Sequence, residues 1–264
     1  MKNTNALLVI SFGTSYEETR ILSLEAIEQD LMKEFPDREF YRAWTSGMIR
    51  RKLKKLGGFT APSLQAALEQ MEKDGIRDIL VQFTHMLRGE EYEKSMETIR
   101  NEAGKFEVIN IGQPLISGEE DAARLAGIIE KQYGVLKEKE MLALMGHGSA
   151  KMAFPAYEKV QEYFIKDGYG NIRIGTVEFD PGIGPVMTKV REDHPEHVIL
   201  APMLVVAGDH VLNDMAGDEE DSWKNQIKKE GIKVTCVKKG LGEYEEIRSI
   251  YVEHAKKAAP LEEK

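Results

Sequence analysis

Short apolar runs rich in strand-forming residues alternate along this chain with segments of helical periodicity, and this alternation restricts the fold more than any other feature. Between the first two runs, Leu24, Ile27, Leu31 and Phe35 form one stripe of a helix. Strands that alternate with helices pair in parallel, because each helix carries the chain back along the sheet. We therefore predict an α/β fold. The runs lie at residues 6–11, 39–44, 78–84, 106–112, 141–146, 171–179, 197–206 and 232–237.

The second four runs repeat the first four, which indicates an internal duplication. A charged junction at residues 133–140 separates the two sets. Each set predicts one parallel sheet flanked by helices. The chain is therefore expected to form two similar lobes, residues 1–134 and residues 140–264, with an active-site cleft between them.

The repeat aligns residues that follow matching strands. When "LLVISFGTS" is placed over "LALMGHGSA", Phe12 falls opposite His147. When "DILVQFTHMLRGEEY" is placed over "HVILAPMLVVAGDHV", Glu91 falls opposite His210. Ligands gather at the carboxyl ends of strands in open parallel sheets. A single histidine after a strand is more often a capping or surface residue, but three metal-binding or proton-accepting side chains at equivalent ends favour a shared site.

Composition restricts the partners of this chain. A net charge of −9 over 264 residues argues against nucleic acid and anionic membranes as partners, since both need a basic face. No apolar window reaches the roughly 20 residues of a membrane span. A single cysteine, Cys236, excludes a disulfide framework and fits a cytoplasmic protein. The sequence also lacks a phosphate-binding motif for a nucleotide. It leaves open whether the chain forms a homo-oligomer.

Two segments are candidates for binding an anionic substrate. Residues 45–62 hold a dense cationic run that includes Arg50 and Arg51, and this run is either a clamp for a ligand rich in carboxylates or a solvated helix face. The turn "SFGTS" follows a strand and opens a helix, so its backbone N–H groups can hold an anion. A tight turn capped by Thr14 or Ser15 is the alternative. The substrate-binding candidates are Ser11, Thr14, Ser15, Arg50, Arg51 and His85. For His85, simple packing in the core is an equal alternative.

Several segments together resemble a known family. These are "LLVISFGTSYEET", "RAWTSGMIRRKL", "GEEYEK", "MGHGS" and "MLVVAGDHVLNDMAGDEEDSWK". They are similar to the cobalt chelatases of anaerobic cobalamin biosynthesis, ATP-independent class II chelatases that act on sirohydrochlorin. The resemblance extends from the first strand to residues 240–248, and the last of these segments is its most specific part.

The resemblance implies a fold, a reaction and a ligand set. It implies two α/β lobes and the insertion of Co²⁺ into sirohydrochlorin or precorrin-2, with Ni²⁺, Fe²⁺ or Zn²⁺ as other substrate metals and no nucleotide. The family's metal ligands correspond to His147, Glu178 and His210, and Glu91 corresponds to a further active-site carboxylate. A carboxylate-rich tetrapyrrole would account for the cationic run.

Metal insertion requires a site that binds a divalent ion, releases it and takes up two pyrrole protons. Two imidazoles and a carboxylate bind such ions less tightly than a thiolate cage does and leave coordination positions open. We expect His147 to accept protons as well as to bind metal, with Glu91 as a relay. A non-catalytic tetrapyrrole or metal carrier and a metal-dependent hydrolase remain as alternatives.

Overall fold

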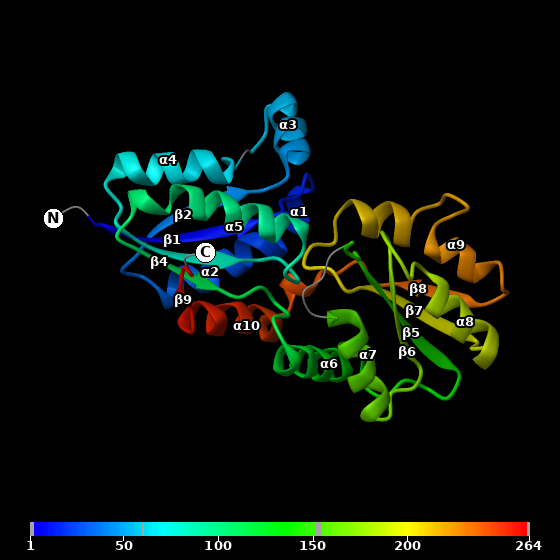
Figure 1. Cartoon of the computed structure of the whole chain (residues 1–264). Coiled ribbons are helices and arrows are strands. Elements are labelled where there is room, and N and C mark those ends of the chain that lie inside the picture. Colours follow the sequence, from blue (N-terminus) through cyan, green and yellow to red (C-terminus); the bar gives the residue numbers. More distant parts are fainter. Residues whose placement is uncertain (1–2, 60, 151–154, 263–264) are drawn as a thin grey trace. The chain divides into compact units, whose positions relative to one another are not determined.

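The computed structural model describes residues 3–59, 61–150 and 155–262, which form two compact units. Unit 1 comprises residues 1–115 and 242–264, and unit 2 comprises residues 116–241. Each unit contains its own sheet and its own core (Figure 1). In the described part of the chain, no helix combines the length and the apolar character that a membrane span needs.

Unit 1 is built on a five-stranded sheet in the order β2-β1-β3-β4-β9, in which all pairs are parallel except β4 with β9. Its strands are β1 (Asn5–Ser11), β2 (Glu39–Trp44), β3 (Asp78–Phe83), β4 (Val108–Gly112) and β9 (Ala259–Pro260). Its main helices are α1 (Glu17–Thr19), which continues through the π-helical η1 (Arg20–Glu25) into α2 (Ala26–Glu34), then α3 (Gly47–Leu56), α4 (Leu64–Asp74), α5 (Glu90–Glu102) and α10 (Glu245–Lys256). Short 3₁₀ turns are η2 (Ala103–Lys105) and η4 (Leu241–Glu243).

Helices cover both faces of this sheet, which explains why residues 6–10 of β1 are all apolar and fully buried. Alternate residues of β1, including Leu8 and Ile10, pack with Leu68 of α4 and Met96 of α5. Leu7, on the other side of β1, is also fully buried. Figure 1 shows α4 and α5 over one face and α2 with α10 over the other.

Unit 2 is built on a four-stranded, fully parallel sheet in the order β6-β5-β7-β8. Its core packs β5 and β7 against α8 and α9, with Met145, Val186 and Trp223 among the buried side chains. On the other face, α6 packs on α7. The elements are α6 (Glu119–Tyr133), β5 (Glu140–Gly146), α7 (Ala156–Lys166), β6 (Ile172–Thr176), α8 (Gly184–Asp193), β7 (His197–Pro202), the π-helical η3 (Val211–Met215), α9 (Trp223–Lys228) and β8 (Lys233–Cys236).

The two sheets share the features that the predicted duplication would give. Both place their first strand between the second and third, and the aligned strands β1 and β5, like β3 and β7, have matching bounds in the repeat alignment. Gly13 and Gly148, which follow the first strands, both have positive φ, +99° and +87°. Glycine adopts this backbone conformation without the steric penalty of a side chain. The same turn therefore leaves the first strand of each unit.

The structure divides the chain differently from the predicted lobes of 1–134 and 140–264. Helix α6 belongs to unit 2 because it packs on α7, whereas α10 and β9 return to unit 1, where they pack on α2 and pair with β4. Strand β7 also ends earlier than expected, at Pro202 rather than at Val206. The cleft expected between the lobes stays a prediction.

Candidate metal site

Three side chains of unit 2 converge at the carboxyl edge of its sheet. The Nε2 atom of His147 lies 4.0 Å from one carboxylate oxygen of Glu178, and Nε2 of His210 lies 3.7 Å from the other. One ligand atom from each residue lies within 4.8 Å of the other two. Their side chains are between a third and a half exposed, so a metal ion can reach them from solvent.

Neighbouring strands bring His147 and Glu178 together. His147 follows β5 and Glu178 lies two residues beyond β6, its parallel neighbour. The backbone N–H of Glu178 donates to the carbonyl of His147 at 2.8 Å. A Cβ atom on Gly148 would lie 1.9 Å from the carbonyl oxygen of Glu178, so only glycine permits this approach. Placement of Glu178 thus depends on the "HGS" turn.

His210 reaches the site along a different path. After β7 ends at Pro202, residues 203–208 form an irregular segment, and His210 lies in the helical turn that continues into η3. The apolar run therefore leaves the sheet at Pro202, before it reaches His210, and the histidine does not lie at the end of a strand. π-Helical turns are frequent at functional sites, because the wider turn redirects side chains.

Hydrogen bonds fix the tautomer of both histidines. Nδ1 of His147 lies 3.0 Å from the carbonyl oxygen of Gly148. A carbonyl oxygen only accepts, so Nδ1 carries a proton, and in the neutral ring Nε2 presents its lone pair toward Glu178. Nδ1 of His210 donates to the carboxylate of Asp214 at 2.8 Å with the same consequence. Metal-binding histidines commonly have such an oriented second nitrogen.

Asp214 was missed by the sequence analysis, although its position contained a signal. It lies four residues after His210, the spacing that puts two side chains on one helix face. The imidazole rings of His147 and His210 are nearly perpendicular, at 82°, with centroids 5.0 Å apart. Each Nε2 atom lies within 4.0 Å of a Glu178 carboxylate oxygen, so one ion could contact all three side chains.

Tyr157 of α7 supports the turn that carries His147. Its hydroxyl accepts a hydrogen bond from the backbone N–H of Gly148 at 3.4 Å. A Cβ atom on Gly146 would lie 2.5 Å from the Tyr157 ring, so the ring packs directly under the strand end. Burial raises the pKa of Tyr157, and the phenol stays neutral. Tyr157 therefore holds the turn that carries His147.

Two hydroxyls expected to bind anions are enclosed in the protein's own hydrogen bonds. Ser11 is fully buried, and its Oγ accepts a hydrogen bond from Thr84 at 2.9 Å. Thr14 is also buried, and its Oγ1 accepts from the backbone N–H of Tyr16. Both hold the turn after β1 and are not available to a substrate. Only Ser15, which accepts from Lys52 Nζ at 3.1 Å, remains a substrate-binding candidate in this turn.

The cationic run forms α3, a helix none of whose residues is buried. Ser46 caps it by accepting from the backbone N–H of Ile49. Contact between Lys52 and Ser15 joins α3 to the turn after β1. The structure thus brings two predicted substrate-binding segments, the cationic run and the "SFGTS" turn, together within unit 1.

Glu91 and His85 also belong to unit 1 but differ in environment. Glu91 lies in the first turn of α5, partly exposed, with its carboxylate 3.4 Å from Lys94 Nζ. His85 is shielded: neither ring nitrogen has a hydrogen-bond partner among the described residues, and burial lowers its pKa to about 4. Its ring packs against the edge of Phe83. These contacts favour the packing interpretation of His85.

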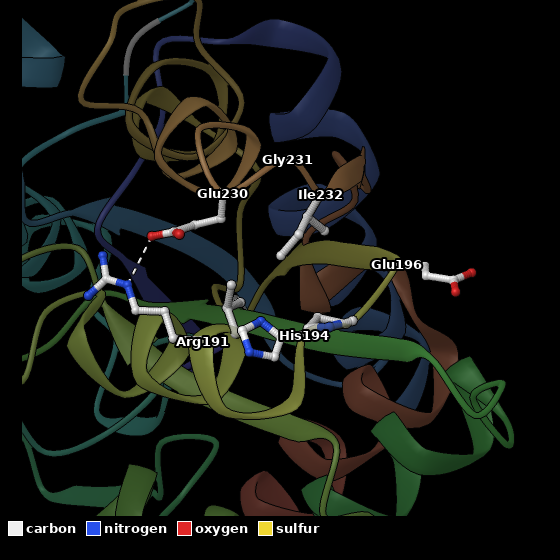
Figure 2. A pocket seen from close by; sticks show the side chains of 8 residues that line it. Arg191, His194, Glu196, Glu230, Gly231 and Ile232 are labelled. Atoms are coloured by element: carbon white, nitrogen blue, oxygen red, sulfur yellow. Dashed lines mark hydrogen bonds and ion pairs between the residues drawn. The ribbon is translucent and has the colours of Figure 1, made fainter.

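A separate hollow of about 330 Å³ lies at the amino end of β7, beside the end of α8 (Figure 2). Arg191 and Glu230 form an ion pair at 2.9 Å there, and His194 ends α8. Its charged side chains do not form a metal-ligand cluster in the described part of the chain, whereas the triad at the carboxyl edge does. His147, Glu178 and His210 are therefore the candidate metal ligands among the described residues.

Comparison with known proteins identifies the family of the chain. The cobalt chelatase (CbiK) family profile matches residues 5–260. The chain is 37% identical over 253 residues to the sirohydrochlorin cobaltochelatase of Salmonella typhimurium, covering 96% of both chains. It is 27% identical over 252 residues to the sirohydrochlorin cobaltochelatase CbiKC of Nitratidesulfovibrio vulgaris, covering 94% of this chain and 88% of that protein.

A solved structure of SirB from Bacillus subtilis with Fe³⁺ has the same fold, with a TM-score of 0.63 at 14% identity over 96% of this chain and 95% of that one. This similarity supports the fold alone. The match of a family profile over nearly the whole sequence, together with a relative of 37% identity, confirms the resemblance seen in the motifs. The chain belongs to the cobalt chelatase (CbiK) family.

Proposed function

We propose that this protein inserts Co²⁺ into sirohydrochlorin without a nucleotide, with His147, Glu178 and His210 as the residues that receive the metal. The observation that carries the proposal is the arrangement of two imidazole Nε2 lone pairs around one carboxylate. The names of the two relatives reported above support the choice of metal and tetrapyrrole.

The ligand set suits an ion that must be bound and then released. Two neutral imidazoles and one carboxylate accept Co²⁺, and coordination positions remain for water or for incoming ring nitrogens. Cys236, the only thiol, lies on β8 and is not part of this cluster. A thiolate would hold the metal more strongly and would slow its transfer.

The two pyrrole protons require acceptors, and the ligands themselves can supply them. Because Nδ1 of His147 already donates to Gly148, its Nε2 is the only lone pair on that ring. Metal binding and proton acceptance at Nε2 must therefore follow one another. As the pyrrole nitrogens take Co²⁺, Nε2 of His147 and the Glu178 carboxylate become free, and each can accept one proton. Glu91, matched to His210 by the repeat, is proposed as a further proton acceptor.

Substrate carboxylates are proposed to bind to unit 1 through Arg50, Arg51 and Ser15. The support is the exposure of α3 and its concentration of positive charge in a chain whose net charge is −9. Guanidinium groups form two-pronged hydrogen bonds with carboxylates, which suits this role.

Anaerobic mixing of the protein, sirohydrochlorin and Co²⁺, followed by absorption spectroscopy, tests the proposal. We expect faster insertion than in the protein-free mixture, and loss of that acceleration in His147→Ala and His210→Ala. His254→Ala, on α10 with Nδ1 3.3 Å from the Gln113 carbonyl, is the matched control and should retain activity. Binding of sirohydrochlorin without any acceleration would identify a carrier and refute the proposal.

A further inference from the structure

The residue that follows the ligand Glu178 has an unfavourable backbone conformation. Phe179 has a φ of +62°, a region that bulky L-residues rarely adopt. The residue is nevertheless 50% exposed, more than the other exposed phenylalanines, Phe12 at 45% and Phe59 at 37%. The ring thus contributes less to the core than a buried phenylalanine would, while its backbone is strained.

Surrounding hydrogen bonds impose this conformation. Thr176, buried at the end of β6, donates from its backbone N–H to the carbonyl of Gly182 at 2.9 Å. Its Oγ1 donates to the carbonyl of Phe179 at 2.9 Å and accepts from the N–H of Gly182 at 3.0 Å. A Cβ atom on Gly175 would lie 2.5 Å from the Gly182 carbonyl, so the turn closes tightly on the strand. Strain of this kind persists where neighbours over-determine it, and it concentrates at binding sites.

The other described non-glycine residue with positive φ has a simpler explanation. His194, at +46°, ends α8, and a left-handed residue at this position is a common way for a helix to stop. Phe179 does not end a helix. The Thr176 hydrogen bonds hold it in this conformation, and its half-exposed ring belongs to the residue that directly follows the candidate ligand Glu178.

We propose that Phe179 is a substrate-contact residue whose ring packs against the conjugated face of the tetrapyrrole that receives the metal from Glu178. This inference rests on the proposed function. A tetrapyrrole presents a flat π surface, and stacking on an aromatic side chain needs no specific polar group on that surface. Because the turn is rigid and phenylalanine has only two side-chain torsions, little conformational freedom is lost on binding.

The test compares glycine substitutions at both left-handed positions. Phe179→Gly should weaken sirohydrochlorin binding about 10-fold, the order of loss seen when one stacking aromatic is removed. Its Co²⁺ affinity should stay at the wild-type level, since the triad is intact. Release of strain offsets the loss of a half-exposed ring, so we expect its Tm to remain within roughly 3 °C of wild type. His194→Gly, the matched control, should bind sirohydrochlorin and Co²⁺ like wild type.

A second pair of variants isolates the aromatic contribution. Phe179→Trp should bind sirohydrochlorin at least as tightly as wild type. Phe179→Leu keeps an apolar side chain without a ring, and its affinity for sirohydrochlorin should fall by most of the 10-fold expected for Phe179→Gly. The inference is overturned if Phe179→Gly or Phe179→Leu binds sirohydrochlorin like wild type. It is also overturned if the Co²⁺ affinity of Phe179→Gly falls as much as its sirohydrochlorin affinity. Wild-type protein that binds sirohydrochlorin but does not accelerate insertion refutes the proposed function instead. In that case, the sirohydrochlorin affinities of the Phe179 variants relative to wild type still test the role of Phe179.

Discussion

Removing the carboxylate of Asp214 should weaken metal binding without removing a metal ligand. Asp214 accepts the Nδ1–H of His210 at 2.8 Å, which fixes the tautomer and directs Nε2 toward Glu178. In Asp214→Ala, the ring can rotate or place its proton on Nε2, and either change must be reversed before metal binds.

The structure sets the size of this effect. A hydrogen bond to a charged group contributes about 1.5–3 kcal/mol, and the Asp214 side chain is 47% exposed, so the lower end applies. About 1.4 kcal/mol corresponds to a tenfold change in Kd. We therefore expect Asp214→Ala to raise the Kd for Co²⁺ about 10-fold. Asp214→Asn, whose amide oxygen can still accept the Nδ1–H, should raise the Kd for Co²⁺ by less.

Calorimetric titration of the metal-free protein with Co²⁺ under anaerobic conditions measures this difference. Asp218→Ala is the matched control, because its carboxylate is fully exposed and pairs with Lys224 rather than with a site residue. Unchanged Co²⁺ affinity in Asp214→Ala would show that this carboxylate does not orient His210. If Asp214→Ala lost Co²⁺ affinity as completely as His210→Ala, Asp214 would itself be a ligand, and the proposed triad would be wrong.

Four further predictions concern the site and the stability of the protein. His147→Ala should slow insertion toward the upper end of the ~10²–10⁴-fold range of acid–base catalysis, and normal insertion by this variant would contradict the proposed mechanism. Glu91→Ala should slow insertion but keep Co²⁺ affinity near wild type in the same titration; lost affinity would make Glu91 a ligand. Neutralising the cationic side chains of α3 should raise the KM for sirohydrochlorin, most at low salt, and a KM indifferent to charge and salt would make α3 a solvated face. Since burial lowers the pKa of His85 to about 4 from its ordinary 6.5, the unfolded chain binds a proton that the native protein does not. The free energy of unfolding should therefore fall as the pH decreases from about 6.5 to about 4. Denaturant titrations of His85→Leu should show a smaller decrease over this pH range. An equal decrease in the variant would show that other groups cause the pH dependence.

The sequence by itself determined the fold class, because strand and helix periodicity and the internal repeat are local patterns. All eight predicted apolar runs became strands, and the two halves share one strand order. The repeat also led to His147 and His210, since parallel strands end at one edge of a sheet. Glu178 came only from the family resemblance, because the sequence around it is less distinctive. Its place beside His147 depends on the pairing of β5 with β6.

Tertiary structure decided which side chains are available and how they are aimed. Ser11 and Ser15 are both serines of one turn, yet one hydroxyl is enclosed against Thr84 and the other lies near α3. Helix α10 packs in unit 1 although it follows unit 2 in the chain, because its partners, α2 and β4, lie far away in sequence.

The orientation of the candidate ligands also depends on the tertiary structure. The carbonyl of Gly148 and the carboxylate of Asp214 fix both imidazole tautomers, and the Thr176 hydrogen bonds hold Phe179 in a conformation that its own preference opposes. Sequence patterns record which residues are apolar and how they are spaced. The direction of a lone pair or of a strained side chain depends on hydrogen bonds that form only after the strands and turns have packed.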